Sequence, residues 1–528
     1  MEQIVQQAAR QDDGTRPARA LVFIGFMGAG KSTAARLLAE QLDLEAVDSD
    51  RLLCERFGHS VAEEFAQHGE ASFRAAEEEL VCELLERAGP GSVIALGGGS
   101  VTSKRVRAAL EPHVTVLLDV EVQDAWARAH KHPETHLERP LASDKDAFTA
   151  LYTERRRLYE GLADAILPPT PRQSIAAANP ALLNLAGAPS HTKLLWASAA
   201  SGSYPVFFGE GLARSGFWPV RMARRFLISD ETVAGLYMQD LGELHGSVTI
   251  QPGEQHKTLS SAETVFSALV RAGITRADQL VALGGGVVGD LAGFCAATYQ
   301  RGVPVIHIPS TLVAQVDSAY GGKTGVDLPE AKNYVGAYHQ PTGVIVDFSL
   351  LKTLPAPELA AGYSEVLKTA LIAGGDLWER ICAEDPLDER MIHACARTKL
   401  AIVAEDERDT GRRQVLNLGH TVGHALEALT GYRRLRHGEA VALGLLAALR
   451  LSGLSDLRQQ VSDLLSAHGL PVTIAAVDPH AVIAAVAHDK KRTGERVPFV
   501  LVERPGDVRG GYQVGDRELL HAISELIT

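Results

Sequence analysis

The chain has 528 residues, of which 46% are hydrophobic and 22% are charged, as in an ordinary globular enzyme. At roughly 150 residues per domain, this length predicts three or four domains. The formal net charge of −13 argues against nucleic acid as the main partner, because duplex binding requires a basic face. Small anionic substrates stay compatible with this charge, since local clusters of arginine and lysine can override it.

The cysteines and the apolar runs predict a cytoplasmic location. Five scattered cysteines without C-x-x-C spacing are typical of a reduced chain. No uninterrupted apolar run approaches the length of about 18 residues that marks a membrane span, so we expect no membrane partner. Residues 1–16 are polar and lack the apolar core of a secretory signal, and residues 1–18 are expected to form a mobile tail.

The first motif is a phosphate loop at residues 25–32, with the pattern G-x-x-x-x-G-K-S. It follows an apolar run at 20–24, typical of a buried parallel strand, and precedes a helical stretch at 32–42. The backbone N–H groups of such a loop surround the phosphates of a nucleotide. Lys31 is expected to reach the β- and γ-phosphates and Ser32 to bind Mg²⁺. The expected ATP contacts are Gly28, Gly30, Lys31, Ser32 and Thr33.

The rest of the chain alternates apolar runs with helix-like segments. In the first part, runs at 93–96 and 114–118 with a helical segment at 77–87 predict a doubly wound parallel sheet. One more helix is expected near 174–185, then a linker at 188–192. An α/β region is predicted at 193–350, with buried strands at 225–229, 280–283, 305–308 and 344–346. A mostly helical region is predicted at 351–528, with helices at 357–373, 391–405, 420–429 and 439–451.

Charged residues after the phosphate loop indicate a phosphoryl acceptor. Asp48 could hold a metal-bound water, and Asp50 could orient an acceptor hydroxyl or accept its proton. Arg74, Arg139 and Arg155 come from three segments and could hold a carboxylate and the transferring phosphoryl group. A surface salt bridge is the commoner role for any single arginine, but the order of these three behind the phosphate loop favours a site.

Together with the glycines at 97–99, this order resembles shikimate kinase, of the nucleoside monophosphate kinase fold, over residues 19–187. The residues that the resemblance assigns to shikimate are Asp50, Arg74, Gly98 and Arg155, while Asp48 and Ser32 serve Mg²⁺. It also places Arg139 in a mobile lid over ATP at about 128–146, and makes Lys31, Asp50 and Arg139 catalytic. The chain departs from the shikimate kinase pattern in two places. The lid is rich in histidine, and Arg156-Arg157 stands where the family often has a proline.

The second half carries a glycine turn of dinucleotide-binding type at 284–290. His420 and His424 are four residues apart and share one predicted helix face. Glu365, His420 and His437 would form a site of two imidazoles and one carboxylate that leaves a position open for substrate, as catalytic Zn²⁺ requires. A single histidine on a helix is more often structural, so the metal site depends on all three residues together.

Cations lie near these motifs at Lys323, Lys332, Lys399 and Arg413. So much positive charge beside a predicted metal indicates a phosphorylated, anionic substrate. A solvated charged face is the alternative, but the glycine-rich segments around the lysines argue against it.

Seven ordered blocks, from 284–290 to 437–439, resemble 3-dehydroquinate synthase over residues 193–528. The family implies Zn²⁺ or Co²⁺ on Glu365, His420 and His437, and NAD that is used without net redox change. The residues implied to bind NAD are Asp230, Glu254, Lys257, Gly285, Gly286, Asp290, Ser310, Thr311, Lys323 and Lys332. Those implied to bind 3-deoxy-arabino-heptulosonate 7-phosphate are Asp317, Lys323, Asn333, Lys368, Lys399, Arg413, Asn417, His424 and Lys490. The implied catalytic residues are Lys323, Lys368, Arg413 and His424.

Some positions depart from the synthase pattern. Ser310 stands where threonine is usual, Asp327 where asparagine is common, Asp409 where glutamate is common, and Pro357 where arginine is frequent. Related sugar-phosphate cyclases share the scaffold, so these departures bear on substrate choice rather than reaction class.

The sequence therefore predicts a bifunctional aromatic-precursor enzyme: an α/β P-loop kinase fused to a synthase with an α/β and a helical domain. Its expected partners are ATP, shikimate and the heptulosonate phosphate, and the family suggests a homodimer through the synthase half. One alternative makes the first part an ATP-sensing regulatory module. Another makes the second half a metal-dependent alcohol dehydrogenase, which would accumulate NADH.

Overall fold

The computed structural model describes residues 17–130, 144–168, 172–219, 224–329, 331–487 and 497–528. The chain forms two compact units, Met1–Trp196 with Pro205–Gly209, and Ala197–Tyr204 with Glu210–Thr528. The chain passes from one unit to the other within the strands β6 (Lys193–Ala199) and β7 (Gly202–Gly209). Among the described residues, no helix combines the length and the apolar character needed to cross a bilayer.

The first unit is built on a parallel sheet in which β1 is central, in the order β2-β3-β1-β4-β5. Its strands are β1 (Leu21–Ile24), β2 (Ala46–Asp48), β3 (Val93–Ala95), β4 (Val114–Leu118) and β5 (Ala165–Leu167). Every residue of β1 is apolar and buried, as a strand covered on both faces requires. The predicted doubly wound sheet is confirmed.

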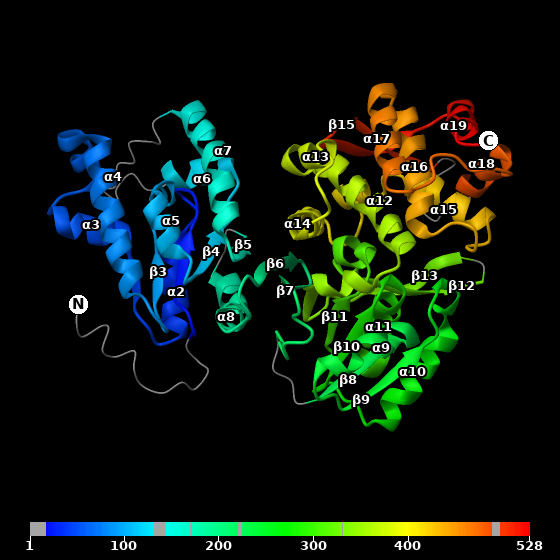
Figure 1. Ribbon diagram of the computed structural model, residues 1–528, viewed down its shortest axis with the longest axis horizontal. Helices are drawn as coiled ribbons and strands as arrows, with labels where there is room; N and C mark the ends of the chain where they lie inside the picture. The colour runs from blue at the N-terminus through cyan, green and yellow to red at the C-terminus, as the bar shows by residue number, and fades with distance from the viewer. Residues whose placement is uncertain (1–16, 131–143, 169–171, 220–223, 330, 488–496) are drawn as a thin grey trace. The chain divides into compact units, whose positions relative to one another are not determined.

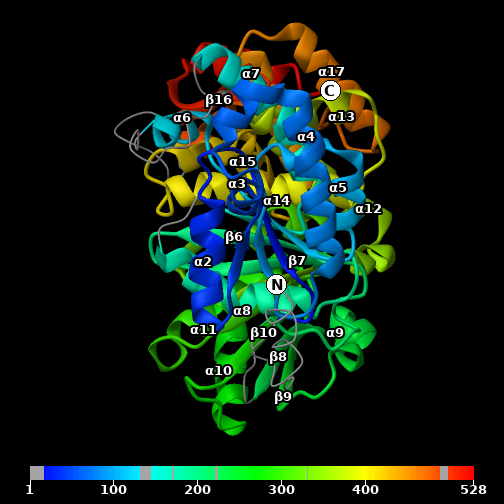
Figure 2. The ribbon, with the colours of Figure 1, turned by 90° about the vertical axis from the view of Figure 1, so that its left-hand side faces the viewer.

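Helices cover both faces of this sheet, with α2 and α5 on opposite sides of the strands (Figure 2). The helices are α2 (Lys31–Gln41), α3 (Ser49–Phe57), α4 (Val61–Arg87), α5 (Lys104–Leu110), α6 (Val122–His130), α7 (Lys145–Leu162) and α8 (Arg172–Ala186). A capping box between Ser60 and Glu63 begins α4, and the backbone of Gly69 (φ 80°) interrupts it.

The second unit begins with a parallel sheet in the order β14-β11-β10-β8-β9. Its strands are β8 (Arg225–Asp230), β9 (Gly246–Ile250), β10 (Gln279–Gly284), β11 (Val305–Pro309) and β14 (Gly343–Asp347), with α9 (Glu231–Tyr237), α10 (Leu259–Arg271) and α11 (Gly286–Thr298) beside it. The chain runs from β8 to β9 on one side and returns to β10 on the other. The carboxyl ends of β8 and β10 therefore mark a topological switch point, where such sheets bind ligands.

The remainder of this unit is mostly helical, as predicted, and is coloured yellow to red in Figure 1. Its helices are α12 (Ala356–Ala373), α13 (Gly375–Cys382), α14 (Glu389–Glu405), α15 (His420–Leu429), α16 (His437–Leu451), α17 (Ser455–Ala467), α18 (Pro479–Ala487) and α19 (Asp516–Ser524).

Two antiparallel hairpins were not predicted from the sequence. The first pairs β12 (Lys323–Leu328) with β13 (Ala331–Tyr338), and the second pairs β15 (Pro498–Arg504) with β16 (Asp507–Gln513). The first hairpin contains the glycine-rich segment around Lys323 and Lys332. It carries several of the predicted ligand-binding residues, so its position matters for the site.

Candidate active sites

The phosphate loop follows β1 and turns tightly on glycines. A Cβ at Gly28 would lie 2.6 Å from the carbonyl oxygen of Ala125, so no larger residue fits there. Gly30 (φ 92°) precedes α2, whose first turn has no side-chain cap, which suits phosphate binding by backbone N–H groups. Nζ of Lys31 lies 2.9 Å from the carbonyl oxygen of Gly25. Ser32 and Thr33 occupy the exposed first turn of α2.

The turn at Gly97–Gly99, which follows β3, lies between the phosphate loop and the predicted shikimate residues. A Cβ at Gly97 would lie 2.4 Å from Oδ1 of Asp50, and one at Gly99 would lie 1.9 Å from Nη1 of Arg74. On the other side, the Cβ position of Gly98 is 3.8 Å from Nζ of Lys31. The turn thus brings the acceptor residues close to the phosphate loop.

Helix α7 supplies the remaining predicted shikimate residue. Arg155 is buried, and its Nε has no hydrogen-bond partner among the described residues. One turn later, Tyr159 donates a hydrogen bond of 2.5 Å to the carbonyl oxygen of Gly98. Burial raises the pKa of Tyr159 to about 12, which keeps this hydroxyl a donor.

Two further predicted residues of this unit are Asp48 and Arg139. Asp48 caps α3, because its Oδ1 accepts from the backbone N–H of Asp50 at 2.9 Å. One oxygen of this carboxylate is therefore engaged locally. Arg139 and most of the predicted lid lie outside the described residues.

In the second unit, small residues bring three helices into close contact. A Cβ at Gly438 of α16 would lie 1.8 Å from the carbonyl oxygen of Ala361 in α12. A Cβ at Gly444 would lie 1.8 Å from the carbonyl oxygen of Gly419, directly before α15. The three helices can therefore approach closely enough for side chains of all three to converge.

Glu365 of α12, His420 of α15 and His437 of α16 meet at this convergence. Oε1 of Glu365 lies 3.5 Å from Nε2 of His420 and 3.4 Å from Nε2 of His437. The three ligand atoms lie within 4.8 Å of one another, close enough to share one ion. Both oxygens of Glu365 are buried and have no regular hydrogen bond from the part of the chain that the structure describes, although Nζ of Lys368 lies 2.5 Å from Oε2.

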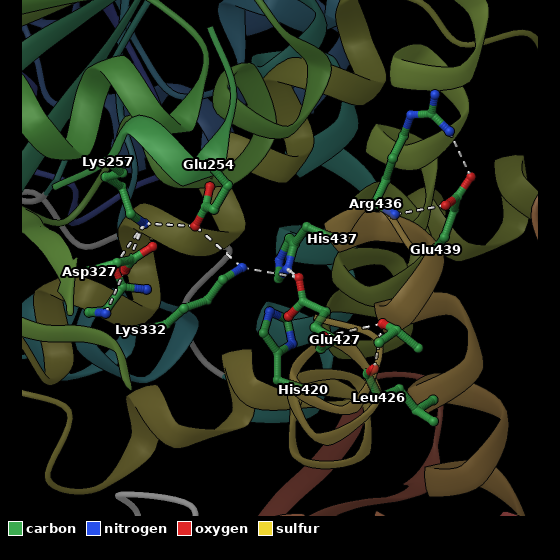
Figure 3. A network of polar contacts seen from close by, with 12 residues as sticks. Glu254, Lys257, Asp327, Lys332, His420, Leu426, Glu427, Arg436, His437 and Glu439 are labelled. Atoms are coloured by element: carbon green, nitrogen blue, oxygen red, sulfur yellow. Dashed lines mark hydrogen bonds and ion pairs between the residues drawn. The ribbon is translucent and has the colours of Figure 1, made fainter. Parts of the chain in front are cut away.

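Glu427 of α15, which the sequence analysis did not single out, lies on the other edge of His437. Its Oε1 is 3.4 Å from Nδ1 of His437 (Figure 3). Burial disfavours a charged His437, yet Glu365 and Glu427 on its two edges raise its pKa to about 10. Two buried carboxylates thus favour positive charge here, which together with the imidazole ligands fits a divalent ion. A second possible ligand set, His424, Glu427 and His437, uses the Nδ1 side.

Several of the predicted NAD residues lie at the carboxyl ends of β8, β10 and β11. Asp230 caps α9, and its Oδ1 accepts from the N–H of Val233 at 2.9 Å. Gly285 precedes α11, and a Cβ there would lie 2.9 Å from Cγ2 of Thr311. The buried Ser310 donates its N–H to the carbonyl oxygen of Gly284. This narrow turn at a helix N-terminus suits close approach of a pyrophosphate.

A chain of alternating charges runs from Lys257 to His437 (Figure 3). Nζ of Lys257 lies 3.1 Å from Glu254 and 3.2 Å from Asp290 of α11. Nζ of Lys332 lies 3.3 Å from Glu254 and 3.3 Å from Glu427. Lys332 therefore links the NAD residues to the residue that contacts His437. Burial alone would raise the pKa of Glu254, but the two lysines lower it to about 2.

Buried charges on the other side of Glu365 form a second cluster. Asp317 lies 3.4 Å from Nζ of Lys368 and 2.8 Å from Nζ of Lys399. Burial lowers the pKa of Lys399 to about 8; Asp317 opposes this effect, while Arg413 and Lys368 add to it. The two lysines thus flank Asp317, and Lys368 also pairs with Glu365.

Other predicted substrate residues are distributed around these clusters. Arg413 is buried, with Nη2 3.0 Å from the carbonyl oxygen of Gly321 and Nη1 2.6 Å from that of Glu407, so it braces the backbone. His424 stands one turn after His420, with ring centroids 5.3 Å apart. Asn417 ends the 3-10 segment before α15. Lys490 lies outside the described residues.

The hairpin β12–β13 carries Lys323 and Asn333. Lys323 contacts Asp409, and Oδ1 of Asn333 accepts from Lys257 at 2.8 Å. Asp409 has a φ of 61°, a left-handed conformation that aspartate adopts more readily than glutamate, which accounts for one departure from the family. Asp327 accepts from the N–H of Asn333 at 2.8 Å, a bond that asparagine could also form.

Two further departures have structural explanations. Pro357 lies in the first turn of α12, where proline costs no helix hydrogen bond. Arg156 pairs with Glu160 at 2.8 Å on α7, and its guanidinium lies over the ring of Tyr152. Neither residue contacts a predicted ligand-binding residue in these interactions.

Comparison with known proteins gives matches for both units. Residues 27–183 match the family model for shikimate kinase, 247–361 the model for 3-dehydroquinate synthase N-terminal, and 362–492 that for 3-dehydroquinate synthase C-terminal. A 3-dehydroquinate synthase of Halorhodospira halophila is 43% identical over 333 residues, 59% of this chain and 93% of that protein. One of Symbiobacterium thermophilum is 42% identical over 332 residues, 58% of this chain and 92% of that protein.

Two solved structures are similar to the second unit at lower identity. A 2-deoxy-scyllo-inosose synthase complexed with carbaglucose-6-phosphate, NAD⁺ and Co²⁺ is 25% identical, with a TM-score of 0.56 over 63% of this chain and 100% of that chain. A 2-epi-5-epi-valiolone synthase from Streptomyces hygroscopicus with NAD⁺ and Zn²⁺ bound is 25% identical, with a TM-score of 0.57. The match covers 62% of this chain and 98% of that chain.

Proposed function

The chain belongs to the 3-dehydroquinate synthase family over most of its second unit and to the shikimate kinase family at residues 27–183, and we propose that it is a bifunctional enzyme of the shikimate pathway. The first unit phosphorylates shikimate with ATP and Mg²⁺. The second converts 3-deoxy-D-arabino-heptulosonate 7-phosphate to 3-dehydroquinate and phosphate, with NAD and Zn²⁺ or Co²⁺ as cofactors. We assign the kinase to residues 19–187 and the two synthase domains to 193–350 and 351–528.

One observation in the second unit supports the synthase most strongly. Glu365, His420 and His437 converge, and Lys332 pairs both with Glu427, which contacts His437, and with the predicted NAD residue Glu254. When bound, the ion would polarise a substrate hydroxyl, and NAD would accept and return a hydride. The chain itself supplies cations: Lys368 and Lys399, held around Asp317, would bind and orient the anionic substrate.

In the first unit, the Gly97–Gly99 turn supports the kinase assignment. It places Asp50 and Arg74 next to the phosphate loop, so an acceptor hydroxyl bound there would face the γ-phosphate. Catalysis would consist mainly of positioning and charge neutralisation by Lys31 and the arginines. A module that only senses ATP would need no acceptor pocket.

The alternatives are less well supported. Four relatives at 41–43% identity, matched over 87–93% of their length, are named 3-dehydroquinate synthase. The buried lysine cluster around Asp317 fits a phosphorylated substrate rather than a simple alcohol. The related cyclases are matched at 25% identity. The homodimer and the cytoplasmic location stay predictions.

The two activities can be tested in the full chain by separate assays. Release of inorganic phosphate from the heptulosonate phosphate, with trace NAD⁺ and added Zn²⁺, is expected without net NADH. No release, or stoichiometric NADH, would remove the synthase assignment. The variant Lys31→Ala should lose shikimate phosphorylation and keep phosphate release; an altered response of the synthase to ATP would instead favour the sensor.

A further inference from the structure

A third group of metal-ligating residues lies in the first unit, outside both active sites. Nε2 of His59 lies 2.8 Å from Oε2 of Glu64, and Nδ1 of His68 lies 3.1 Å from the same oxygen. The ligand atoms of the three residues lie within 4.8 Å of one another. Neither the kinase chemistry nor the predicted shikimate contacts involve these residues.

The start of α4 explains why these three side chains meet. Ser60 is the N-cap of α4, so His59 immediately precedes the cap and Glu64 is the fourth helical residue. These two positions usually hold a pair of apolar residues that pack together and fix the direction of the incoming chain. Here they hold a histidine and a glutamate, and His68 lies one turn beyond Glu64 on the same helix face.

The hydrogen bonding of His59 orients it as a ligand. Its Nδ1 lies 2.9 Å from the carbonyl oxygen of Phe57, and since that oxygen can only accept, Nδ1 carries a proton. The other nitrogen, Nε2, then directs its lone pair at the carboxylate of Glu64, unless it is protonated as well. A nitrogen lone pair and a carboxylate oxygen that lie 2.8 Å apart repel each other. The contact therefore requires either a proton on Nε2 or a cation between the two atoms. A ring nitrogen fixed in this way by a backbone carbonyl is the usual arrangement of a metal-bound histidine.

We propose that His59, Glu64 and His68 form a site for a divalent transition metal ion, of which Zn²⁺ is the simplest probe. Two imidazoles and one carboxylate are suitable ligands, and a fourth position stays open to water. The carboxylate is nearly buried, with its side chain 7% exposed, while His68 is 54% exposed, so the ion could enter from solvent. Bound there, it would fix the turn before α4 to the helix segment that ends at Gly69.

Equilibrium dialysis of the full chain against about 10 µM Zn²⁺ tests the site by counting ions, independently of either activity. The variants His68→Asn and Glu64→Gln should each bind one ion fewer per chain than the unchanged protein. The control His480→Asn, which alters an exposed histidine of α18 in the second unit, should bind the unchanged number. Substitution at the half-exposed His68 is expected to leave the fold intact, and shikimate phosphorylation by the variant checks this.

A hydrogen-bonded group that takes no metal gives a different result. Equal Zn²⁺ content in the unchanged protein, His68→Asn and Glu64→Gln would overturn the proposal. A deficit in His68→Asn alone would also overturn it, because the carboxylate common to both contacts would then not be a ligand.

Discussion

Oε1 of Glu427 lies 3.4 Å from Nδ1 of His437, on the edge of the ring opposite Glu365. When an ion occupies the site, a carboxylate at this position would accept the Nδ1 proton while the unprotonated Nε2 binds the ion. Glu427 also contacts Lys332. Its carboxylate therefore contacts both the proposed metal ligand His437 and the lysine that reaches the predicted NAD residues. We therefore expect Glu427 to act as a positioning residue for His437.

Replacing Glu427 by methionine should weaken Zn²⁺ binding at the synthase site about 10- to 100-fold, the usual effect of removing the partner of a metal-bound histidine. Glu427→Gln keeps an acceptor oxygen and should recover part of the affinity. Competition with a chelator at fixed pH measures both variants. Glu405→Gln on the exposed face of α14 is the control. Unchanged affinity in Glu427→Met would show that Glu427 does not orient His437.

Contact between helices gives a second prediction. In Gly438→Ala, the added methyl would overlap the backbone of Ala361, so α12 and α16 must separate. Overpacking of this kind costs about 1–3 kcal/mol of unfolding free energy and should displace His437 from Glu365. We expect a lower thermal midpoint and weaker Zn²⁺ binding, with shikimate phosphorylation unchanged. Gly235→Ala is the control, because a Cβ on this exposed position of α9 meets nothing within 4 Å.

Local motifs could be predicted from the sequence, while long-range positions depended on resemblance. The phosphate loop, the strand before it and the starts of α12 and α15 follow from apolar runs, glycines and prolines. Nothing in the spacing of Glu365, His420 and His437 could show that three helices converge. That convergence results from Gly419, Gly438 and Gly444, whose role is visible only once the helices are packed.

Glu427 and the hairpin β12–β13 were missed for different reasons. His420, His424 and Glu427 are spaced i, i+4 and i+7, so they share one face of α15, and helix periodicity could have found the glutamate. The hairpin, by contrast, contains glycines, lysines and few β-branched residues, and its pairing depends on packing against α11 rather than on strand propensity.

The pKa of Lys399, which burial lowers to about 8, predicts a pH dependence of the synthase. Below pH 8 the side chain is an ammonium that attracts the anionic substrate, and above pH 8 it loses this charge. The value of kcat/KM for the heptulosonate phosphate should therefore fall as pH rises through about 8. In Lys399→Arg the charge persists, so this decline should move to higher pH even if the overall rate is lower. A profile that is the same in both proteins would exclude Lys399 as its cause.

The hydrogen bond from Tyr159 to the carbonyl oxygen of Gly98 predicts a selective effect on the kinase. Tyr159→Phe frees the turn that positions Asp50 and Arg74, and a hydrogen bond of this kind contributes about 0.5–1.5 kcal/mol. We expect KM for shikimate to rise roughly two- to tenfold, since about 1.4 kcal/mol corresponds to a factor of ten. KM for ATP and synthase activity should not change. Tyr152→Phe is a matched control on the same helix, because its hydroxyl donates to the carbonyl oxygen of Val120, away from the shikimate residues. An equal rise in both variants would mean that the effect comes from general loosening of α7 and not from the Gly97–Gly99 turn.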